Sequence, residues 1–178
     1  MINVKNCLLL IIDVQERLLP VIHEGDGVLK NINILINAAE ILGLDMVITE
    51  QYPKGLGCTV SELLYTDSTE IYEKDTFSCL LQPELLQKIR KDQKIDLILC
   101  GVEAHICVLK TALDALDQGF KVHIVADAVS SRTPQNKQLG LDRIKQSNGY
   151  IVSMEMILFM LMERAGTDTF KAISKLIK

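Results

Sequence analysis

The sequence predicts an α/β fold, in which a parallel sheet has helices packed on both of its faces. Three observations support this prediction. Apolar runs of strand length alternate with segments of helical periodicity along the whole chain. The first run, residues 7–12, is apolar at every position, as in a central strand that is buried on both faces. No repeat, low-complexity tract or linker interrupts the alternation, so residues 1–178 are expected to form one domain.

Turn residues and apolar periodicity place each element in order. The run 7–12 stops at Asp13, and apolar side chains at helical spacing then predict a helix that ends before Gly43. The stretch 50–57 is rich in Pro and Gly and is expected to be a loop, whereas Pro83 is placed to begin a helix. The expected strands are 7–12, 44–49, 70–73, 96–100, 121–126 and 150–152, and the expected helices are 28–42, 83–91, 104–118, 134–148 and most of the segment after the last strand.

Right-handed crossovers between parallel strands bring the carboxyl ends of all the strands to one edge of the sheet. The expected architecture is therefore a three-layer α/β/α, Rossmann-like one, with a small-molecule site at that edge, near the point where the strand order reverses. A nucleotide site is not expected, because neither a G-x-G-x-x-G nor a G-x-x-x-x-G-K-[ST] loop follows the first strand.

Composition limits the classes of function. The net charge of -4 and the scattered Lys and Arg residues argue against a nucleic-acid partner. The first apolar run is about six residues long, too short for a membrane span or a secretory signal, so we expect no membrane partner and a cytoplasmic location. Five cysteines without a CxxC pair indicate neither a disulfide framework nor a zinc site, which leaves reduced thiols available for chemistry.

Three reactive side chains follow predicted strands. Asp13 ends the first strand, Lys74 follows the strand 70–73, and Cys107 comes just after the strand 96–100. Cys107 is expected in the first turn of a helix, where unpaired N–H groups and the helix dipole favour a thiolate. Asp13 is placed to take the thiol proton, and Lys74 to hold and balance that carboxylate. Taken singly, each residue has an ordinary structural explanation, as a buried apolar Cys, a turn Asp or a solvated Lys. Their common edge is what predicts a catalytic site.

Three segments of the chain resemble the signatures of the isochorismatase-like cysteine hydrolases, in the order and spacing of that family. They are Asp13-Val14-Gln15, Lys74-Asp75-Thr76-Phe77-Ser78 and Gly101-Val102-Glu103-Ala104-His105-Ile106-Cys107-Val108. The resemblance extends over nearly the whole chain, and the third segment is the most specific. Residues 49–57 and 127–132 further resemble the subgroup of isochorismatase domain-containing proteins.

The resemblance implies a catalytic triad of Asp13, Lys74 and Cys107. It also implies a cis peptide bond between Val102 and Glu103, and an oxyanion hole made by the backbone N–H groups of Glu103 and Cys107. Donors of this kind are typically worth about 3 kcal/mol each in a transition state.

Two differences from better-known members of that family bear on cofactor and substrate. The Asp-x-His metal motif of nicotinamidases is absent after the second strand, and Ala104 stands where amidase members commonly have Thr. We therefore expect no metal and no organic cofactor. Isochorismatases proper usually lack the cysteine, so hydrolysis of isochorismate is not favoured either.

Several other residues are expected near the site. The predicted lining of the substrate pocket is Gln15, Glu50, Tyr52 and Phe77, with ordinary packing or solvation as the alternative for each. His105 stands two residues before Cys107 and points to a different side of a helix, so a Cys–His dyad is not expected.

These observations lead to a hypothesis and one alternative from another class. The hypothesis is a cysteine hydrolase that acts on a C–N bond of a small amide- or carbamoyl-type substrate through a thioester. The alternative is a catalytically silent binding or scaffold protein with the same fold. The segment 154–162 is apolar on nearly every face. A helix buried within the domain would explain this, but we favour a helix that partly covers a subunit interface, and hence a homo-oligomer.

Overall fold

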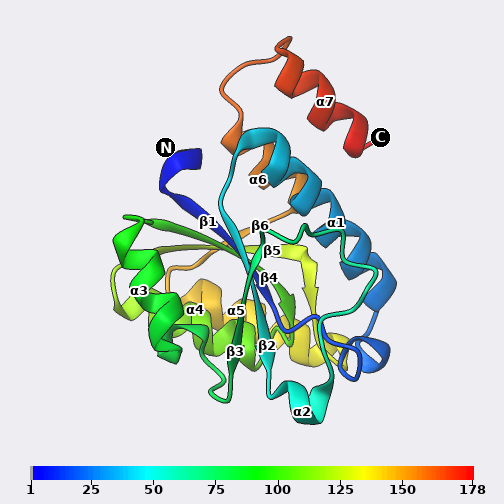
Figure 1. Ribbon diagram of the computed structural model, residues 1–178, viewed down its shortest axis with the longest axis vertical. Helices are drawn as coiled ribbons and strands as arrows, with labels where there is room; N and C mark the ends of the chain where they lie inside the picture. The colour runs from blue at the N-terminus through cyan, green and yellow to red at the C-terminus, as the bar shows by residue number, and fades with distance from the viewer. Residues whose placement is uncertain (1) are drawn as a thin grey trace.

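The computed structural model describes residues 2–178 and contains a six-stranded sheet between two layers of helices (Figure 1). All neighbouring strands are parallel, and their order is β3-β2-β1-β4-β5-β6. The strands are β1 (Cys7–Ile12), β2 (Met46–Gln51), β3 (Glu70–Lys74), β4 (Asp96–Val102), β5 (Lys121–Ser130) and β6 (Tyr150–Val152). The order reverses between β1 and β4, so the loops that leave these two strands diverge and frame a crevice.

The helices divide between the two faces of the sheet (Figure 1). One face carries α1 (Gly25–Leu42) and α6 (Met154–Leu161), with α7 (Asp168–Leu176) packed on α1. The other face carries α3 (Pro83–Lys91), α4 (Cys107–Asp117) and α5 (Pro134–Gln146). The remaining elements are short: α2 (Pro53–Leu56) and the 3-10 helices η1 (Val4–Asn6), η2 (Leu19–Val21) and η3 (Cys79–Leu81). None of the helices described for residues 2–178 is long and apolar enough to cross a lipid bilayer.

The structure confirms the three-layer α/β/α class and all six expected strands, and it shifts several boundaries, three of them with a clear local cause. The stretch 50–57 is not wholly a loop, because Pro53 begins the single turn of α2. The strand expected over 121–126 continues to Ser130, because a bulge opposite β4 restores its pairing at Val129. The helix expected from residue 104 begins only at Cys107, after a turn.

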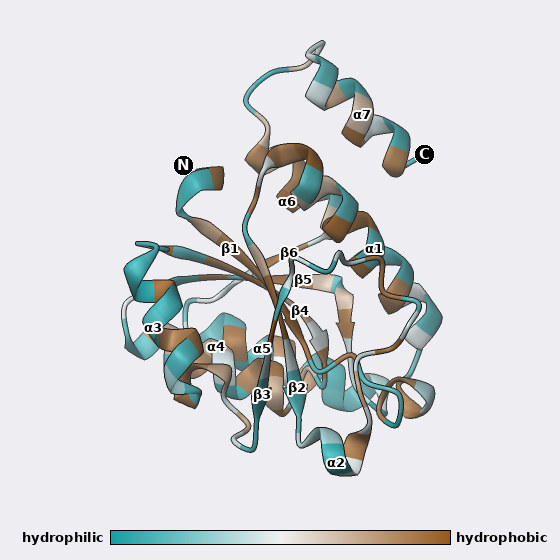
Figure 2. Ribbon diagram, viewed as in Figure 1, coloured by the Kyte–Doolittle hydropathy of each residue, from teal (hydrophilic) through white to brown (hydrophobic). Residues whose placement is uncertain are grey.

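Each face of the sheet buries its own apolar cluster. All six residues of β1 are buried, and their side chains alternate between the two sides. Leu9 and Ile11 pack towards α1, while Leu8 and Leu10 pack towards α3 and α4. Figure 2 shows the apolar colouring concentrated along the central strands, whereas the edge strand β3 is hydrophilic. Burial on both faces fixes the position of β1 and so of the residue that follows it.

Gly101 marks the closest approach of β4 to β1. Its φ is 105°, and a Cβ atom there would lie 2.1 Å from the carbonyl oxygen of Ile12. We expect Gly101→Ala to lower the free energy of unfolding by about 3–5 kcal/mol, because it adds both backbone strain and a backbone clash. Gly27→Ala is the control, since nothing lies within 4 Å of a Cβ at that helical position. It should be neutral or stabilise by up to about 1 kcal/mol. Urea unfolding measures both, and equal losses would contradict this explanation.

Candidate active site

Asp13 follows β1 directly and is fully buried, with its backbone in the left-handed region at φ 54°. Its two carboxylate oxygens have separate partners. The ammonium of Lys74 donates to Oδ2 at 2.7 Å, and the hydroxyl of Thr49 donates to Oδ1 at 2.7 Å. Thr49 lies on β2, next to β1, and Lys74 lies on β3, one strand further, so the sheet itself fixes the orientation of the carboxylate.

Lys74 is the last residue of β3, and its side chain is only 1% exposed. Besides Asp13, its ammonium donates to Oε1 of Gln51 at 2.7 Å. Gln51 is also the residue of β2 that lies opposite Lys74 in the sheet register. Burial opposes the positive charge, but the Asp13 carboxylate and the nearby thiols together hold the pKa of Lys74 above its usual value. Lys74 is therefore a buried cation with a fixed partner.

Cys107 is the first residue of α4 and is 6% exposed. Its thiol lies beside the Asp13 carboxylate, and each group affects the pKa of the other. Burial, and then the negative charge of Asp13, raise the pKa of Cys107 well above its usual range, although Lys74 acts in the opposite direction. Burial and Asp13 thus favour the protonated thiol over the thiolate that the helix terminus would stabilise.

Asp13 is suited to remove the proton from this thiol. Burial raises the pKa of Asp13, while the ammonium of Lys74 and the hydroxyl of Thr49 lower it. A carboxylate whose pKa is raised is a stronger base than an exposed one. The adjacent ammonium of Lys74 offsets its negative charge. The three side chains that the sequence placed at one edge of the sheet are brought together.

This protonation state predicts an order of alkylation for the cysteines. Cys58 is exposed, whereas the other four are buried. Iodoacetamide at neutral pH should therefore modify Cys58 first, and the modification of Cys107 should accelerate as the pH rises, because only the thiolate reacts. Peptide mass spectrometry over time measures both rates. A Cys107 that reacts faster than Cys58 in the free protein would contradict a protonated resting thiol.

The turn between β4 and α4 presents backbone donors next to the thiol. The peptide bond between Val102 and Glu103 is cis. The N–H groups of Glu103 and Cys107 donate to no other protein group within residues 2–178, whereas that of Ala104 donates to the carbonyl of Ser130 at 2.8 Å. Two unpaired N–H groups beside a thiol can donate hydrogen bonds to a negatively charged substrate oxygen.

The side chain of Glu103 holds this turn against the loop that follows β5. It is buried, and its Oε2 accepts hydrogen bonds from the backbone N–H of Arg132 at 3.0 Å and from Nε of Arg132 at 3.1 Å. Two residues after Glu103, His105 makes a similar contact: its Nδ1 and the hydroxyl of Ser131 are 2.9 Å apart. His105 thus contacts the loop after β5 instead of the thiol, as expected from its position.

Two of the predicted pocket residues belong to the framework of the site. Gln15 is fully buried, and its amide donates to the carbonyls of Gln51 and Gly57 and accepts from the N–H of Gln51. Glu50 accepts from both the N–H and the hydroxyl of Thr59, at 2.6 and 2.7 Å. Their hydrogen-bonding groups tie the loop after α2 to β2, and their place in the pocket lining stays a prediction.

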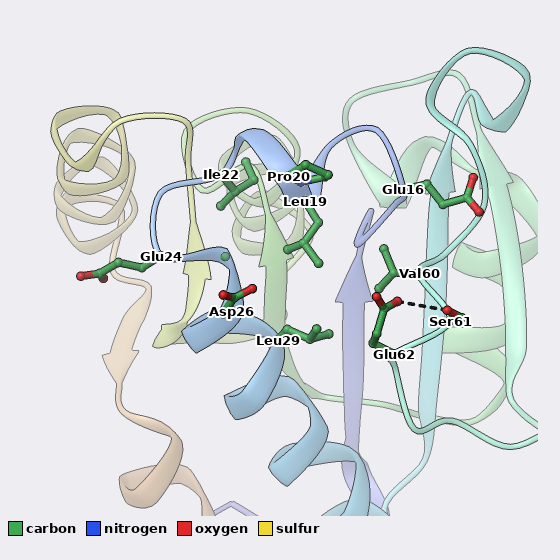
Figure 3. A pocket seen from close by; sticks show the side chains of 11 residues that line it. Glu16, Leu19, Pro20, Ile22, Glu24, Asp26, Leu29, Val60, Ser61 and Glu62 are labelled. Carbon is green, nitrogen blue, oxygen red and sulfur yellow. Dashed lines mark hydrogen bonds between the residues drawn. The ribbon is translucent and has the colours of Figure 1, made fainter.

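The other two predicted pocket residues are each 58% exposed. Tyr52 lines a cavity of about 400 Å³ that also includes Lys74, together with residues of η3 and α3. Phe77 does not line this cavity. A larger cavity, of about 730 Å³, lies between the loop after β1, the start of α1 and residues 60–62 (Figure 3). It contains none of Asp13, Lys74 and Cys107.

Sequence reasoning gave no role to Thr49, whose hydroxyl holds one oxygen of Asp13. A polar residue near the carboxyl end of β2, beside the strand that Asp13 follows, was the available signal. No group of three or more His, Cys, Asp or Glu side chains is placed to hold a metal ion in the part of the chain that the structure describes, residues 2–178.

A comparison with protein families matches residues 7–156 to the model of the isochorismatase domain. The chain belongs to the isochorismatase family. Isochorismatase relatives match it over most of their length. The "Secreted isochorismatase effector Isc1" of Phytophthora sojae is 41% identical, over 96% of this chain and 83% of that protein. "Isochorismatase domain-containing protein 2" of Danio rerio is 38% identical, over 99% and 89%.

Solved structures of isochorismatase-like proteins share the fold. The "MAR1 Ribonuclease from Caenorhabditis elegans" superposes with a TM-score of 0.93 and is 35% identical, over 99% of this chain and 91% of that one. The predicted family and its subgroup are thereby confirmed, and the protein is an isochorismatase-family hydrolase. Because the Phytophthora relative is described as secreted, a cytoplasmic location for this chain stays a prediction.

Proposed function

We propose that this isochorismatase-family protein is a cysteine hydrolase that cleaves the C–N bond of a small amide- or carbamoyl-type substrate through a thioester. The observation that supports the proposal is the buried pair of Lys74 and Asp13, 2.7 Å apart, beside the thiol of Cys107. Burying an ion pair costs desolvation free energy, so its retention beside a cysteine suggests a role in function. Proton transfer from the thiol to Asp13 is the chemistry that this arrangement supports.

In the first half of the reaction, Asp13 takes the proton of the Cys107 thiol as the sulfur attacks the carbonyl carbon. The oxyanion that forms accepts hydrogen bonds from the N–H groups of Glu103 and Cys107. The C–N bond then breaks, and the leaving nitrogen takes the proton from Asp13. The amine departs, and the acyl group is left as a thioester on Cys107.

In the second half, Asp13 is again a carboxylate and takes a proton from a water molecule. The resulting hydroxide attacks the thioester carbon, the C–S bond breaks, and the sulfur recovers the proton from Asp13. Lys74 stays protonated in both halves, holds Asp13 by its hydrogen bond and offsets the negative charge. This cycle needs no metal and no organic cofactor.

A cavity of about 400 Å³ reaches the proposed site only at Lys74, since neither Asp13 nor Cys107 lines it. The three side chains, and not the volume of this cavity, are what support the proposal.

A panel of small amides and carbamoyl compounds tests the proposal. Each compound is mixed with the protein and quenched in acid, and intact-protein and peptide mass spectrometry then locates any added mass. We expect an acyl increment on Cys107 and release of the amine. If Cys107 is the nucleophile, the rate of amine release should fall in Cys107→Ser. Unchanged release in that variant would refute the assignment.

The catalytically silent binding or scaffold protein is the alternative. It predicts that compounds bind without amine release and without an adduct at Cys107. Calorimetric binding with neither product in the same panel would favour this alternative over the hydrolase.

RNA is a second alternative substrate, because the Caenorhabditis elegans structure is described as a ribonuclease. The net charge of -4 argues against RNA as a partner of this chain, and the buried ammonium of Lys74 is already engaged by Asp13. We expect labelled RNA to stay intact in the presence of the protein, and cleavage that is lost in Cys107→Ala would overturn the choice of substrate.

We also propose that the protein forms a homo-oligomer through the outer side of α6. Ile157 and Leu158 of this helix are buried in the domain, but Met156, Phe159 and Met160 are exposed to 52, 45 and 43%. Burial within one domain therefore accounts for only one side of the apolar segment. A second copy of the chain is the partner that would cover the other side.

The Phe159→Glu variant is expected to weaken the self-association by placing a charge in the proposed contact. Size-exclusion chromatography with light scattering should give a larger mass for the wild type than for this variant. Leu139→Glu, at a position on α5 that is 66% exposed, is the matched control and should leave the mass unchanged. Equal monomeric masses for all three proteins would rule out the contact.

A further inference from the structure

A second group of ionisable side chains lies at the opposite edge of the sheet from the triad. Asp96 begins β4, His123 lies near the start of β5, and Tyr150 begins β6. Because β4 ends at the turn that carries Glu103, its seven residues separate the two places by about 20 Å. The proposed hydrolase mechanism makes no use of this group.

His123 and Asp96 form a buried pair with one open position. Nε2 of His123 lies 2.8 Å from Oδ1 of Asp96, and the two residues are 4% and 5% exposed. The other ring nitrogen, Nδ1, is buried and has no hydrogen-bond partner within residues 2–178. In a neutral imidazole, an Nε2–H that faces a carboxylate leaves Nδ1 as an acceptor. A buried acceptor without a donor lowers stability, so a group that supplied the donor would be held there.

A cavity of about 380 Å³ adjoins this pair. Both His123 and Asp96 line it, and its other walls are mainly apolar, with Tyr150 on β6 and two methionines, Met156 and Met160, on α6. The rings of His123 and Tyr150 are stacked, with centroids 5.0 Å apart and planes inclined by 20°. Rings and thioether sulfurs both contact aromatic groups favourably. The cavity thus combines an apolar, aromatic-compatible wall with one unused acceptor.

We propose that this cavity binds a small aromatic molecule that carries a single hydrogen-bond donor, such as a phenolic hydroxyl. The hydroxyl donates to Nδ1 of His123, and the ring packs between Tyr150 and the methionines of α6. Nδ1 is buried in the free protein, so a side chain of the cavity wall has to move on binding, and we infer that it is the ring of Tyr150. This ring is 52% exposed and begins an edge strand of three residues, which leaves it room to do so.

Phenol is the probe, and toluene, which has the same shape without the donor, is the comparison ligand. The chain has three histidines, so side-chain NMR of protein labelled with ¹⁵N-histidine resolves the response. We expect phenol to shift the ring signals of His123 saturably, without shifting those of His23 and His105. Phenol should bind at least about tenfold more tightly than toluene, because only phenol satisfies the buried acceptor.

Two variants separate the cavity from general surface binding. Met160→Trp adds bulk at the exposed side of the cavity without touching the buried pair, and it should weaken phenol binding more than tenfold. Leu139→Trp, on α5 and away from the cavity, should not. Titrations also use Phe159→Glu, since a second copy seated on α6 would cover the mouth of the cavity.

The proposal fails if His123 does not respond in either the wild type or Phe159→Glu. It fails equally if toluene matches phenol, or if Met160→Trp binds phenol as well as the wild type does. Because the proposed nucleophile lies at the other edge of the sheet, Cys107→Ala should bind phenol normally. Binding in Cys107→Ala thus tests the cavity independently of the hydrolase.

Discussion

Replacing Cys107 by Ala is expected to abolish turnover of any amide that the panel identifies, with a fall in kcat of at least about ten-thousandfold. The reason is that the sulfur forms and breaks a covalent bond in each half of the reaction, and a methyl group can do neither. Steady-state assays on purified protein measure the effect, and the acyl increment seen by mass spectrometry should vanish with it.

Cys100→Ala is the matched control for this change. Cys100 is as buried as Cys107 but belongs to the apolar cluster on the opposite face of the sheet, with α1. Both variants lose the same atom from a buried position, so they share any general cost in stability. Cys100→Ala should keep kcat within about twofold of the wild type. Similar losses in the two variants would mean that packing, and not nucleophilic attack, explains the effect.

Replacing Lys74 by Met is expected to lower the free energy of unfolding by about 3–5 kcal/mol, because it leaves the buried carboxylate of Asp13 without its positive partner. Methionine fills a similar space, so the loss is mainly electrostatic. Urea unfolding at neutral pH measures it. The double variant Asp13→Asn/Lys74→Met, which has no buried charge at this place, should recover part of that loss. A double variant less stable than Lys74→Met would contradict the electrostatic cause.

The loss in Lys74→Met should also depend on pH. Burial raises the pKa of Asp13 in the wild type, and removal of the ammonium raises it further. A carboxyl whose pKa is higher in the folded than in the unfolded state loses stability as the pH rises between those two values. The difference in stability between wild type and variant should therefore be small in acid and grow towards neutral pH. A difference that shrinks as the pH rises would have the wrong sign.

Local sequence signals were sufficient to predict the architecture and the common edge at which Asp13, Lys74 and Cys107 meet. The unbroken apolar run of β1 marks a strand buried on both faces, and the residues that end parallel strands must meet at one edge. The first residue of α4 was harder to predict, because the turn before it is held by partners that are distant in the sequence. The Ala104 N–H, for example, binds the carbonyl of Ser130 on β5.

The environment of the Cys107 thiol could not be predicted from its neighbours in the sequence. A cysteine at the start of a helix suggested a thiolate, since the helix dipole is a property of the nearest residues. Its pKa depends instead on burial and on Asp13, which is distant along the chain and adjacent in space. Likewise the hydrogen-bond partners of Gln15 and Glu50, such as Gly57 and Thr59, could not be identified from spacing alone.

Lys74 sits at the end of an edge strand. Four of the five residues of β3 are exposed or half-buried, and the strand pairs with β2 on one side only, so the buried end at Lys74 is what anchors it. Transient detachment of this border would withdraw the countercharge from Asp13 at the same moment. If the proposed mechanism holds, local opening of this edge of the sheet should abolish activity before the rest of the domain unfolds.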